Sequence, residues 1–152
     1  VLATNPLFPH AATEHRIRWA GLNADDFELY TTYENSRHCK PNLEYYMDIT
    51  NSLGVEPCEC LMVGNDVDED MTTEKLGMNV FLVTECIINK SQKDISLYPN
   101  GDFSDHACQR REYVERIQKQ EHSQQDQGKP PKDFSCFHFI NLISSILYCK
   151  SL

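Results

Sequence analysis

Several features that would assign the sequence to a familiar class are missing. No CxxC pair occurs among its 7 cysteines, which argues against a thioredoxin-like site and a regular zinc knuckle. Neither an internal repeat nor a secretory signal is visible. Basic residues are few, with 14 Lys and Arg against 23 Asp and Glu, and the net charge of -9 opposes binding to nucleic acid backbones.

The remaining composition is that of one globular domain. The 152 residues are 40% hydrophobic and 24% charged, enough for one ordinary domain with its own core. Cys58 and Cys60 lead into an apolar run, where cysteine is a common small core residue, and reduced thiols predict a cytoplasmic protein. The acidic surface still permits a small phosphorylated substrate, because one local pocket with a metal can outweigh the global field.

The apolar pattern predicts an α/β fold with a Rossmann-like parallel sheet and flanking helices. Cys60–Val63 is an unbroken apolar run, as expected for a strand buried on both faces. The strand–helix–strand order around it indicates a parallel sheet. In chain order we expect a strand end at 1–3 (the chain starting inside that strand), a helix over 10–22, a short strand over 27–33, a helix from Pro41 to about Leu53, a strand over 60–63 closed by Gly64, a helix to about Leu76 closed by Gly77, and a strand over 79–84.

The second half of the chain is divided by composition. Residues 1–121 are expected to form the domain, with an irregular segment over 87–103, a turn at Pro99-Asn100-Gly101 and a helix over 105–120. Residues 122–133 read as a polar linker. The apolar tail, 134–152, is expected to be a helix that packs on the domain or binds a partner. A membrane contact is the weaker alternative, since a spanning helix needs about 20 apolar residues, and a junction unrelated to the domain is the other.

Acidic residues crowd the end of the predicted strand over 60–63. The segment Gly64-Asn65-Asp66-Val67-Asp68-Glu69-Asp70 lies where open α/β sheets bind ligands, beyond the carboxyl end of a strand. Clustered carboxylates repel one another unless a hard cation such as Mg²⁺ compensates them. An acidic helix start, stabilised by the helix dipole, is an equally weighted explanation of the cluster alone.

A calcium loop is a third explanation of these acids, and the sequence argues against it. Asp66, Asp68 and Asp70 match the spacing of the first three calcium ligands. However, the sixth position is Met71 rather than Gly, and the twelfth is Gly77 rather than Glu. The preceding element is also a predicted strand rather than a helix.

Two further polar residues follow predicted element ends. Thr4 comes after the first strand, where its hydroxyl and the backbone N–H groups of the turn at Asn5 could hold a phosphoryl oxygen; alone, it reads as a turn-initiating threonine. Lys40 precedes Pro41, at a helix start where anions collect. A single lysine of this kind is most often only solvated.

Taken in order, these segments resemble the haloacid dehalogenase-like (HAD) superfamily of hydrolases, over about residues 1–105. The resemblance implies that Thr4 and Asn5 bind the substrate phosphoryl group and that Lys40 stabilises the negative charge of the nucleophile and of that group. It also implies that Asp66, supported by Asp70, holds Mg²⁺, with Asn65 as an alternative ligand because it stands where the family usually has an acid.

The family's first motif, two Asp residues two apart after an apolar strand, is absent. Asp25-Asp26 follows no such strand, and Asp66 and Asp68 belong to the fourth motif. In the family, the missing strand is central in the sheet and carries the nucleophile. We therefore expect a fragment that begins at the second motif, inactive alone, whose sheet is completed by an N-terminal segment or a protein partner. The short spacing from Thr4 to Lys40 also leaves no room for a large cap.

The sequence thus predicts an Mg²⁺-dependent phosphohydrolase of HAD-like type, truncated, acting on a small phosphorylated molecule. A signalling receiver domain uses similar residues, but there the acids come first, whereas here the order is Thr, Lys, acids. The remaining alternative is a non-catalytic α/β module whose apolar tail binds a protein partner. The substrate and the oligomeric state are not encoded in any motif.

Overall fold

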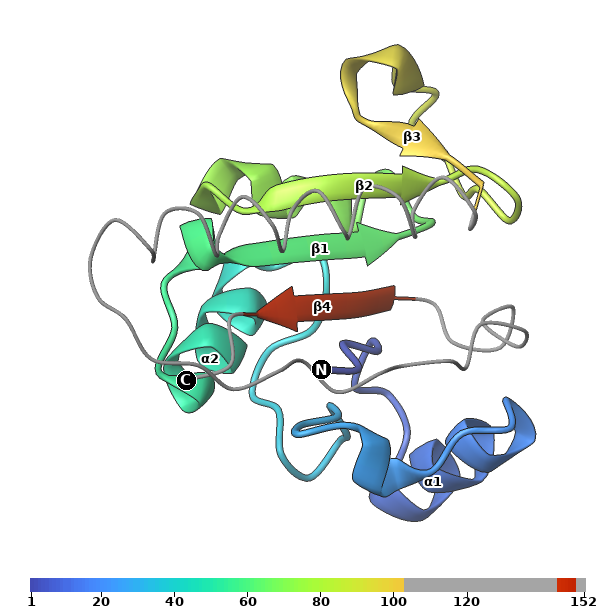
Figure 1. Cartoon of the computed structure of the whole chain (residues 1–152), viewed down its shortest axis with the longest axis vertical. Helices are drawn as coiled ribbons and strands as arrows, with labels where there is room; N and C mark the ends of the chain where they lie inside the picture. The colour runs from blue at the N-terminus through green and yellow to red at the C-terminus, as the bar shows by residue number, and fades with distance from the viewer. Residues whose placement is uncertain (103–144, 150–152) are drawn as a thin grey trace, which may run out of the picture.

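The computed structural model of the chain describes residues 1–102 and 145–149 (Figure 1). The helices within these ranges fall short of the length and apolar character that a membrane-spanning helix requires. The elements, with η marking 3₁₀ helices, are α1 (His10–Trp19), η1 (Ala24–Asp26), α2 (Leu43–Leu53), η2 (Pro57–Glu59), β1 (Cys60–Gly64), η3 (Met71–Leu76), β2 (Asn79–Val83), η4 (Ile95–Leu97), β3 (Asn100–Gly101) and β4 (Ser145–Cys149).

The sheet has the strand order β3-β2-β1-β4. β1, β2 and β3 run parallel, and β4 runs antiparallel to β1. All five residues of β1 are buried, as expected for a strand covered on both faces. The predicted strands at 60–63 and 79–84 are therefore confirmed, and the helices with a parallel three-stranded sheet confirm an α/β fold.

β4 corrects the expectation of a helical tail for residues 145–149. Ser145 pairs with Gly64 and Cys149 with Cys60, so β4 follows β1 along its full length. The backbone explains the difference, because the N–H and C=O groups on this side of β1 need partners and an extended segment supplies them. The predictions for 103–144, including the helix over 105–120 and the linker, lie outside the described residues.

The N-terminal segment joins the sheet through isolated bridges rather than strands. Leu2 bridges Tyr30 in parallel and Ile146 in antiparallel fashion. Hydrogen bonds from Leu2 N to Leu29 O (2.9 Å) and from Thr31 N to Leu2 O (3.1 Å) hold it in place. The strands expected over 1–3 and 27–33 are thus each reduced to a single bridging residue, Leu2 and Tyr30. β4 consequently lies between β1 and the N-terminal segment (Figure 1).

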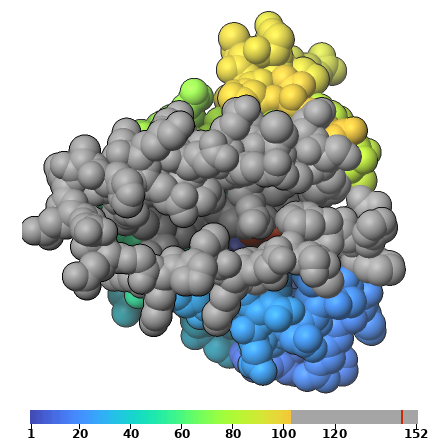
Figure 2. Space-filling model, in the orientation of Figure 1, coloured from blue at the N-terminus to red at the C-terminus, as the bar shows by residue number. Residues whose placement is uncertain are grey.

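Two apolar clusters hold these parts together. The larger packs α2 against β1 and β2, through side chains that include Tyr45, Tyr46, Ile49, Met62 and Leu82. The smaller joins Leu2 to Ile17 and Ala20, with Ile146 of β4 packed against them. In the space-filling view, the surface of α1 lies at one end of the molecule and that of the η4–β3 segment at the other (Figure 2).

The start of α2 differs from the sequence-based expectation, whereas its end at Leu53 agrees with it. The helix begins at Leu43 rather than Pro41, and Asn42 is its N-cap, because the Asn42 side chain accepts a hydrogen bond from Glu44 N (3.0 Å). Pro41 lies outside the helix and forms a cis peptide bond with Lys40. Gly54 ends the helix at a φ of 68°, in the left-handed region that favours glycine.

The segments after β1 and β2 are less regular than expected. The helix predicted after Asp70 is the short 3₁₀ helix η3, which Gly77 ends at a φ of 85°. The turn predicted at Pro99-Asn100-Gly101 is replaced by strand β3, in which Asn100 and Gly101 pair with Leu82 and Val83. The neighbouring edge of β2 explains this change, since it offers unpaired backbone groups to an extended segment.

The N-cap of α2 gives a stability prediction. Replacing Asn42 by Ala removes the acceptor for Glu44 N and should lower the free energy of unfolding by about 0.5–2 kcal/mol. Urea denaturation followed by circular dichroism measures the change. Asn51→Ala, an exposed position on the same helix, is the matched control and should leave the stability unchanged or slightly raised. Equal stability of the two variants would show that the cap contributes nothing.

Candidate functional site

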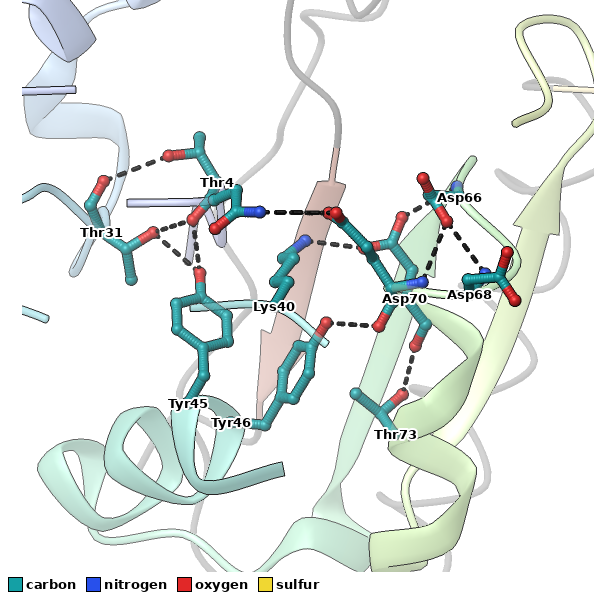
Figure 3. A network of polar contacts seen from close by, with 11 residues as sticks. Thr4, Thr31, Lys40, Tyr45, Tyr46, Asp66, Asp68, Asp70 and Thr73 are labelled. Atoms are coloured by element: carbon teal, nitrogen blue, oxygen red, sulfur yellow. Dashed lines mark hydrogen bonds and ion pairs between the residues drawn. The ribbon is translucent and has the colours of Figure 1, made fainter. Parts of the chain in front are cut away.

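The polar residues predicted from the sequence gather at the carboxyl ends of the parallel strands (Figure 3). Lys40 from the segment before α2 meets Asp70 from the loop after β1. Asn5, next to Thr4, reaches Glu69 in the same loop. The site therefore combines three segments that are far apart in the sequence, at the edge where open α/β sheets bind ligands.

A buried ion pair between Lys40 and Asp70 lies at the centre of the site. The Lys40 Nζ atom is 2.6 Å from Asp70 Oδ1, and both side chains are 1% exposed. Asp70 Oδ2 accepts a second hydrogen bond, from Asp66 N (3.0 Å). Gly64 makes this arrangement possible, because a Cβ atom there would overlap the Asp70 carboxylate. Asp70 thus compensates the buried ammonium group of Lys40 and fixes the loop backbone.

Asp66 shapes the loop that follows β1. Its Oδ1 atom accepts hydrogen bonds from the backbone N–H groups of Asp68 and Glu69, both at 2.9 Å. No hydrogen-bond partner of Asp66 Oδ2 is found among the described residues. The carboxylate of this mostly buried residue therefore has one oxygen committed to the loop and one available for a ligand.

Asp68 points to a different partner. It forms an ion pair with Lys93 (2.8 Å), and its second oxygen accepts from Ser91 N (3.2 Å). The hydrogen bond from Lys93 lowers the pKa of the Asp68 carboxyl. Asp68 therefore ties the loop after β2 to the loop after β1, and its charge is compensated locally.

Thr4 is buried, and its hydroxyl has a partner in the protein. Thr4 Oγ1 donates to Thr31 O (3.2 Å), while Thr4 O accepts from Thr31 Oγ1 and from Tyr45 Oη, both at 2.7 Å. A hydroxyl has a single proton to donate. Binding a phosphoryl oxygen through this donor would therefore require the hydroxyl to rotate away from Thr31.

Asn5 connects the N-terminal segment to the acidic loop. Its Nδ2 atom lies 3.4 Å and 3.5 Å from the two carboxylate oxygens of Glu69. Burial, together with the negative charge of Asp66, raises the pKa of Glu69. The Oδ1 atom of Asn5 is buried without a hydrogen-bond partner among the described residues.

Asn65 also holds an unsatisfied oxygen. Its Nδ2 atom donates to Cys86 O (2.6 Å) in the loop after β2, while its Oδ1 atom is buried and has no hydrogen-bond partner within the described ranges. A buried acceptor without a donor is unfavourable, and a bound water or ion is one way to satisfy it. Asn5 and Asn65 thus each present an oxygen suited to a donor or a cation.

The donor set fits a hard cation in part. Asp66 Oδ2 and Asn65 Oδ1 are oxygen ligands of the kind that Mg²⁺ prefers, together with waters. Asp70 fits less well as a direct ligand, because its oxygens already accept from Lys40 and from Asp66 N. Within residues 1–102 and 145–149, no three His, Cys, Asp or Glu residues form a group that could hold a metal by themselves.

Two adjacent tyrosines of α2 support the site and were not predicted as site residues. Tyr45 Oη donates to Thr4 O, and Tyr46 Oη donates to Glu69 O (2.7 Å). The rings meet edge to face, with centroids 4.8 Å apart. Burial raises the pKa of both hydroxyls, so they remain protonated donors. The only sequence signal was a pair of aromatic residues in a helix, which ordinarily indicates core packing.

The buried ion pair gives the second prediction. Lys40→Met leaves the Asp70 carboxylate buried without its ammonium partner and should lower the free energy of unfolding by about 3–5 kcal/mol. Adding Asp70→Asn in the same chain should recover part of that loss, because the amide carries no uncompensated charge. Urea denaturation of the single and double variants tests this, with the exposed Lys75→Met as control. A Lys40→Met protein as stable as the control would contradict the described geometry.

Comparison with known proteins gives two partial matches. The chain is 36% identical over 59 residues to a Bacillus subtilis (strain 168) protein named "Putative phosphatase YhcW", covering 39% of this chain and 27% of that protein. It is 29% identical over 104 residues to an Arabidopsis thaliana protein named "Flavin mononucleotide hydrolase 1, chloroplatic", covering 62% of this chain and 40% of that protein. The chain therefore spans less than half of either curated relative.

The two other comparisons give no match. No family model matches the chain, and no solved structure matches it. The similarity is thus to proteins named for phosphatase or hydrolase activity, over part of their length.

Proposed function

We propose that the chain is part of an Mg²⁺-dependent phosphohydrolase of the HAD-like type, acting on a small phosphorylated molecule. The observation that carries the proposal is the buried Lys40–Asp70 pair beneath Gly64, beside the Asp66 loop and the Thr4-Asn5 segment. Desolvating a lysine and its carboxylate is costly, and such a buried pair at the ligand-binding edge of a sheet is a candidate functional site. The names of the two relatives support the same reaction class.

The geometry suits binding of an anionic group at the carboxyl edge of the sheet. Lys40 contributes a positive charge in a site of low dielectric, where its attraction for a phosphoryl oxygen is stronger than in water. Asp70 holds the ammonium group in position through the 2.6 Å contact. Thr4 and Asn5 add a hydroxyl and backbone N–H groups, once the Thr4 hydroxyl turns from Thr31 towards the ligand.

Asp66 and Asn65 would hold Mg²⁺ in this scheme, and Asp70 would position the loop that carries Asp66. When bound, Mg²⁺ supplies neutralisation of charge on the phosphoryl oxygens. The acidic loop itself favours a cation, because burial and then the negative charge of Asp66 raise the pKa of the Glu69 carboxyl. A bound cation would reverse that effect.

The nucleophile is the remaining part of the proposal. No Asp-x-Asp pair in the printed sequence follows an apolar strand apart from Asp66 and Asp68; this scheme assigns Asp66 to the metal, and Asp68 pairs with Lys93. We propose that the attacking carboxylate belongs to a segment outside this chain and that the chain alone is inactive. In that arrangement the incoming strand would take the position beside β1 that β4 occupies here.

The second candidate is a non-catalytic α/β module whose tail binds a protein partner. The observation that bears on it is β4, since residues 145–149 pair with β1 of the same chain. A tail engaged in this way has to leave the sheet before it can bind elsewhere as a strand. The structure therefore gives this candidate less support than the phosphohydrolase.

Mg²⁺ binding gives the third prediction. Asp66→Asn should weaken Mg²⁺ affinity by about 10-fold or more, because it removes the charged ligand from the loop. Asp68→Asn is the matched control, and it should have a smaller effect because Asp68 pairs with Lys93. Isothermal titration calorimetry with MgCl₂ measures both. Equal affinities of the Asp66→Asn and unmodified proteins would favour the non-catalytic module.

The absence of a nucleophile gives the fourth prediction. The chain, supplied with Mg²⁺, should hydrolyse p-nitrophenyl phosphate no faster than buffer alone, although it should bind Mg²⁺. The colorimetric release of p-nitrophenol measures this, with the Asp66→Asn protein assayed in parallel as a check for contaminating phosphatase. A turnover that Asp66→Asn abolishes would place the nucleophile within this chain and would contradict the proposal that it belongs to another segment.

A further inference from the structure

The carboxylate of Glu69 lies against the side-chain donor of Asn5. Its two oxygens are 3.4 Å and 3.5 Å from Asn5 Nδ2, so the contact is divided between them and neither hydrogen bond is short. Asn5 directly follows Thr4 in the chain. A carboxylate resembles a phosphoryl group in its negative charge and its acceptor oxygens. Glu69 therefore occupies a donor that an anionic ligand of this segment would also use.

The backbone of Glu69 is anchored on both sides of its Cα atom. Glu69 N donates to Asp66 Oδ1 (2.9 Å), and Glu69 O accepts from Tyr46 Oη (2.7 Å). The residue is only partly buried, so its side chain has space on the solvent side. Rotation about the side-chain bonds would therefore move the carboxylate away from Asn5 without disturbing the loop.

The charge of Glu69 is less well compensated than that of its neighbours in the loop. Asp68 pairs with Lys93 at 2.8 Å, and Asp70 pairs with Lys40 at 2.6 Å. Within the described part of the chain, no lysine, arginine or histidine forms an ion pair with Glu69. Its carboxylate is thus held at Asn5 by two long hydrogen bonds alone, and a ligand that makes stronger contacts would displace it.

We propose that Glu69 is a specificity-determining residue, which occupies the Asn5 donor in the unliganded chain and turns away when a phosphoryl oxygen binds there. The proposal rests on the phosphoryl-binding role proposed above for Thr4 and Asn5. Displacement loses the contact with Asn5 and leaves two negative groups close together, so it lowers the affinity for a phosphate dianion. The site therefore disfavours free inorganic phosphate and leaves the advantage to phosphorylated molecules that supply further contacts of their own.

The affinity of the full chain for inorganic phosphate tests the proposal. Equilibrium dialysis against radiolabelled phosphate, at one fixed concentration of MgCl₂, compares the unmodified chain with Glu69→Gln. We expect Glu69→Gln to bind phosphate about 10-fold more tightly, because glutamine keeps the size of the side chain and removes its charge. A variant that only disturbs the fold would lose affinity, so a gain reports on the site itself.

Glu74→Gln is the matched control. Glu74 is exposed on η3, and its replacement changes the net charge of the chain by the same amount. Since exposed charges are screened by salt, the phosphate affinity of this variant should stay within about 2-fold of that of the unmodified chain. A gain as large in Glu74→Gln as in Glu69→Gln would trace the effect to net charge and would overturn the proposal.

The other outcomes separate the role of Glu69 from the proposed function. Phosphate binding that is equal or weaker in Glu69→Gln overturns the proposal and leaves the phosphoryl site standing. Binding to neither protein overturns the phosphoryl site and, with it, the role of Glu69. A loss of Mg²⁺ affinity in Glu69→Gln as large as that in Asp66→Asn would assign Glu69 to the metal and would also overturn the proposal.

A measurement on the unmodified chain does not depend on the folding of any variant. NMR signals of the Asn5 side-chain amide and of the Glu69 carboxyl carbon are followed while inorganic phosphate is added. Both signals should shift and reach their limits at the same phosphate concentration, because the ligand replaces the contact between the two groups. A Glu69 carboxyl signal that stays constant while phosphate saturates the protein would contradict the displacement.

Discussion

Lys40 and Asp70 lose their hydration together when the chain folds, and the arrangement around them follows from that requirement. Removing two charges from water is unfavourable unless the two groups lie close together and their other hydrogen-bonding atoms also have partners. Asp70 meets the condition by accepting from Lys40 and from Asp66 N, and Gly64 leaves room for its carboxylate. The glycine at the end of β1 and the loop that follows it are thus constrained by one ion pair.

The tyrosines of α2 extend this constraint to both halves of the site. Tyr45 holds the backbone of Thr4, and Tyr46 holds that of Glu69, while their rings pack edge to face. Because one helix turn carries both contacts, a shift of α2 would move the N-terminal segment and the acidic loop together. The geometry of the polar site is therefore set by helix packing as much as by the charged residues.

Sequence reasoning succeeded where the signal is local. β1 and β2 were predictable because short unbroken apolar runs such as Cys60–Val63 are typical of strands buried on both faces. The glycines at 54 and 77 end their helices as expected. It failed where the conformation of a segment depends on contacts with residues far away in the sequence. The sequence of residues 145–149 suggests a helix, but in the fold these residues pair with the edge of β1. The expected start of α2 at Pro41 was also wrong, because the side chain of Asn42 caps the helix and Leu43 is its first residue. The pairing of Lys40 with Asp70 was likewise invisible, since spacing shows which polar groups share an edge but not which ones bond.

The position of β4 also bears on how the chain folds. Its partner β1 precedes it by most of the length of the chain, so the pairing of Cys60 with Cys149 closes a very long loop. Such non-local contacts raise the contact order and slow folding, because the entropy of loop closure is lost before the contacts form. During synthesis, β1 is complete long before β4 emerges. Until then, one edge of the sheet remains open, and that edge is the point at which the nascent chain is most exposed to association with other strands.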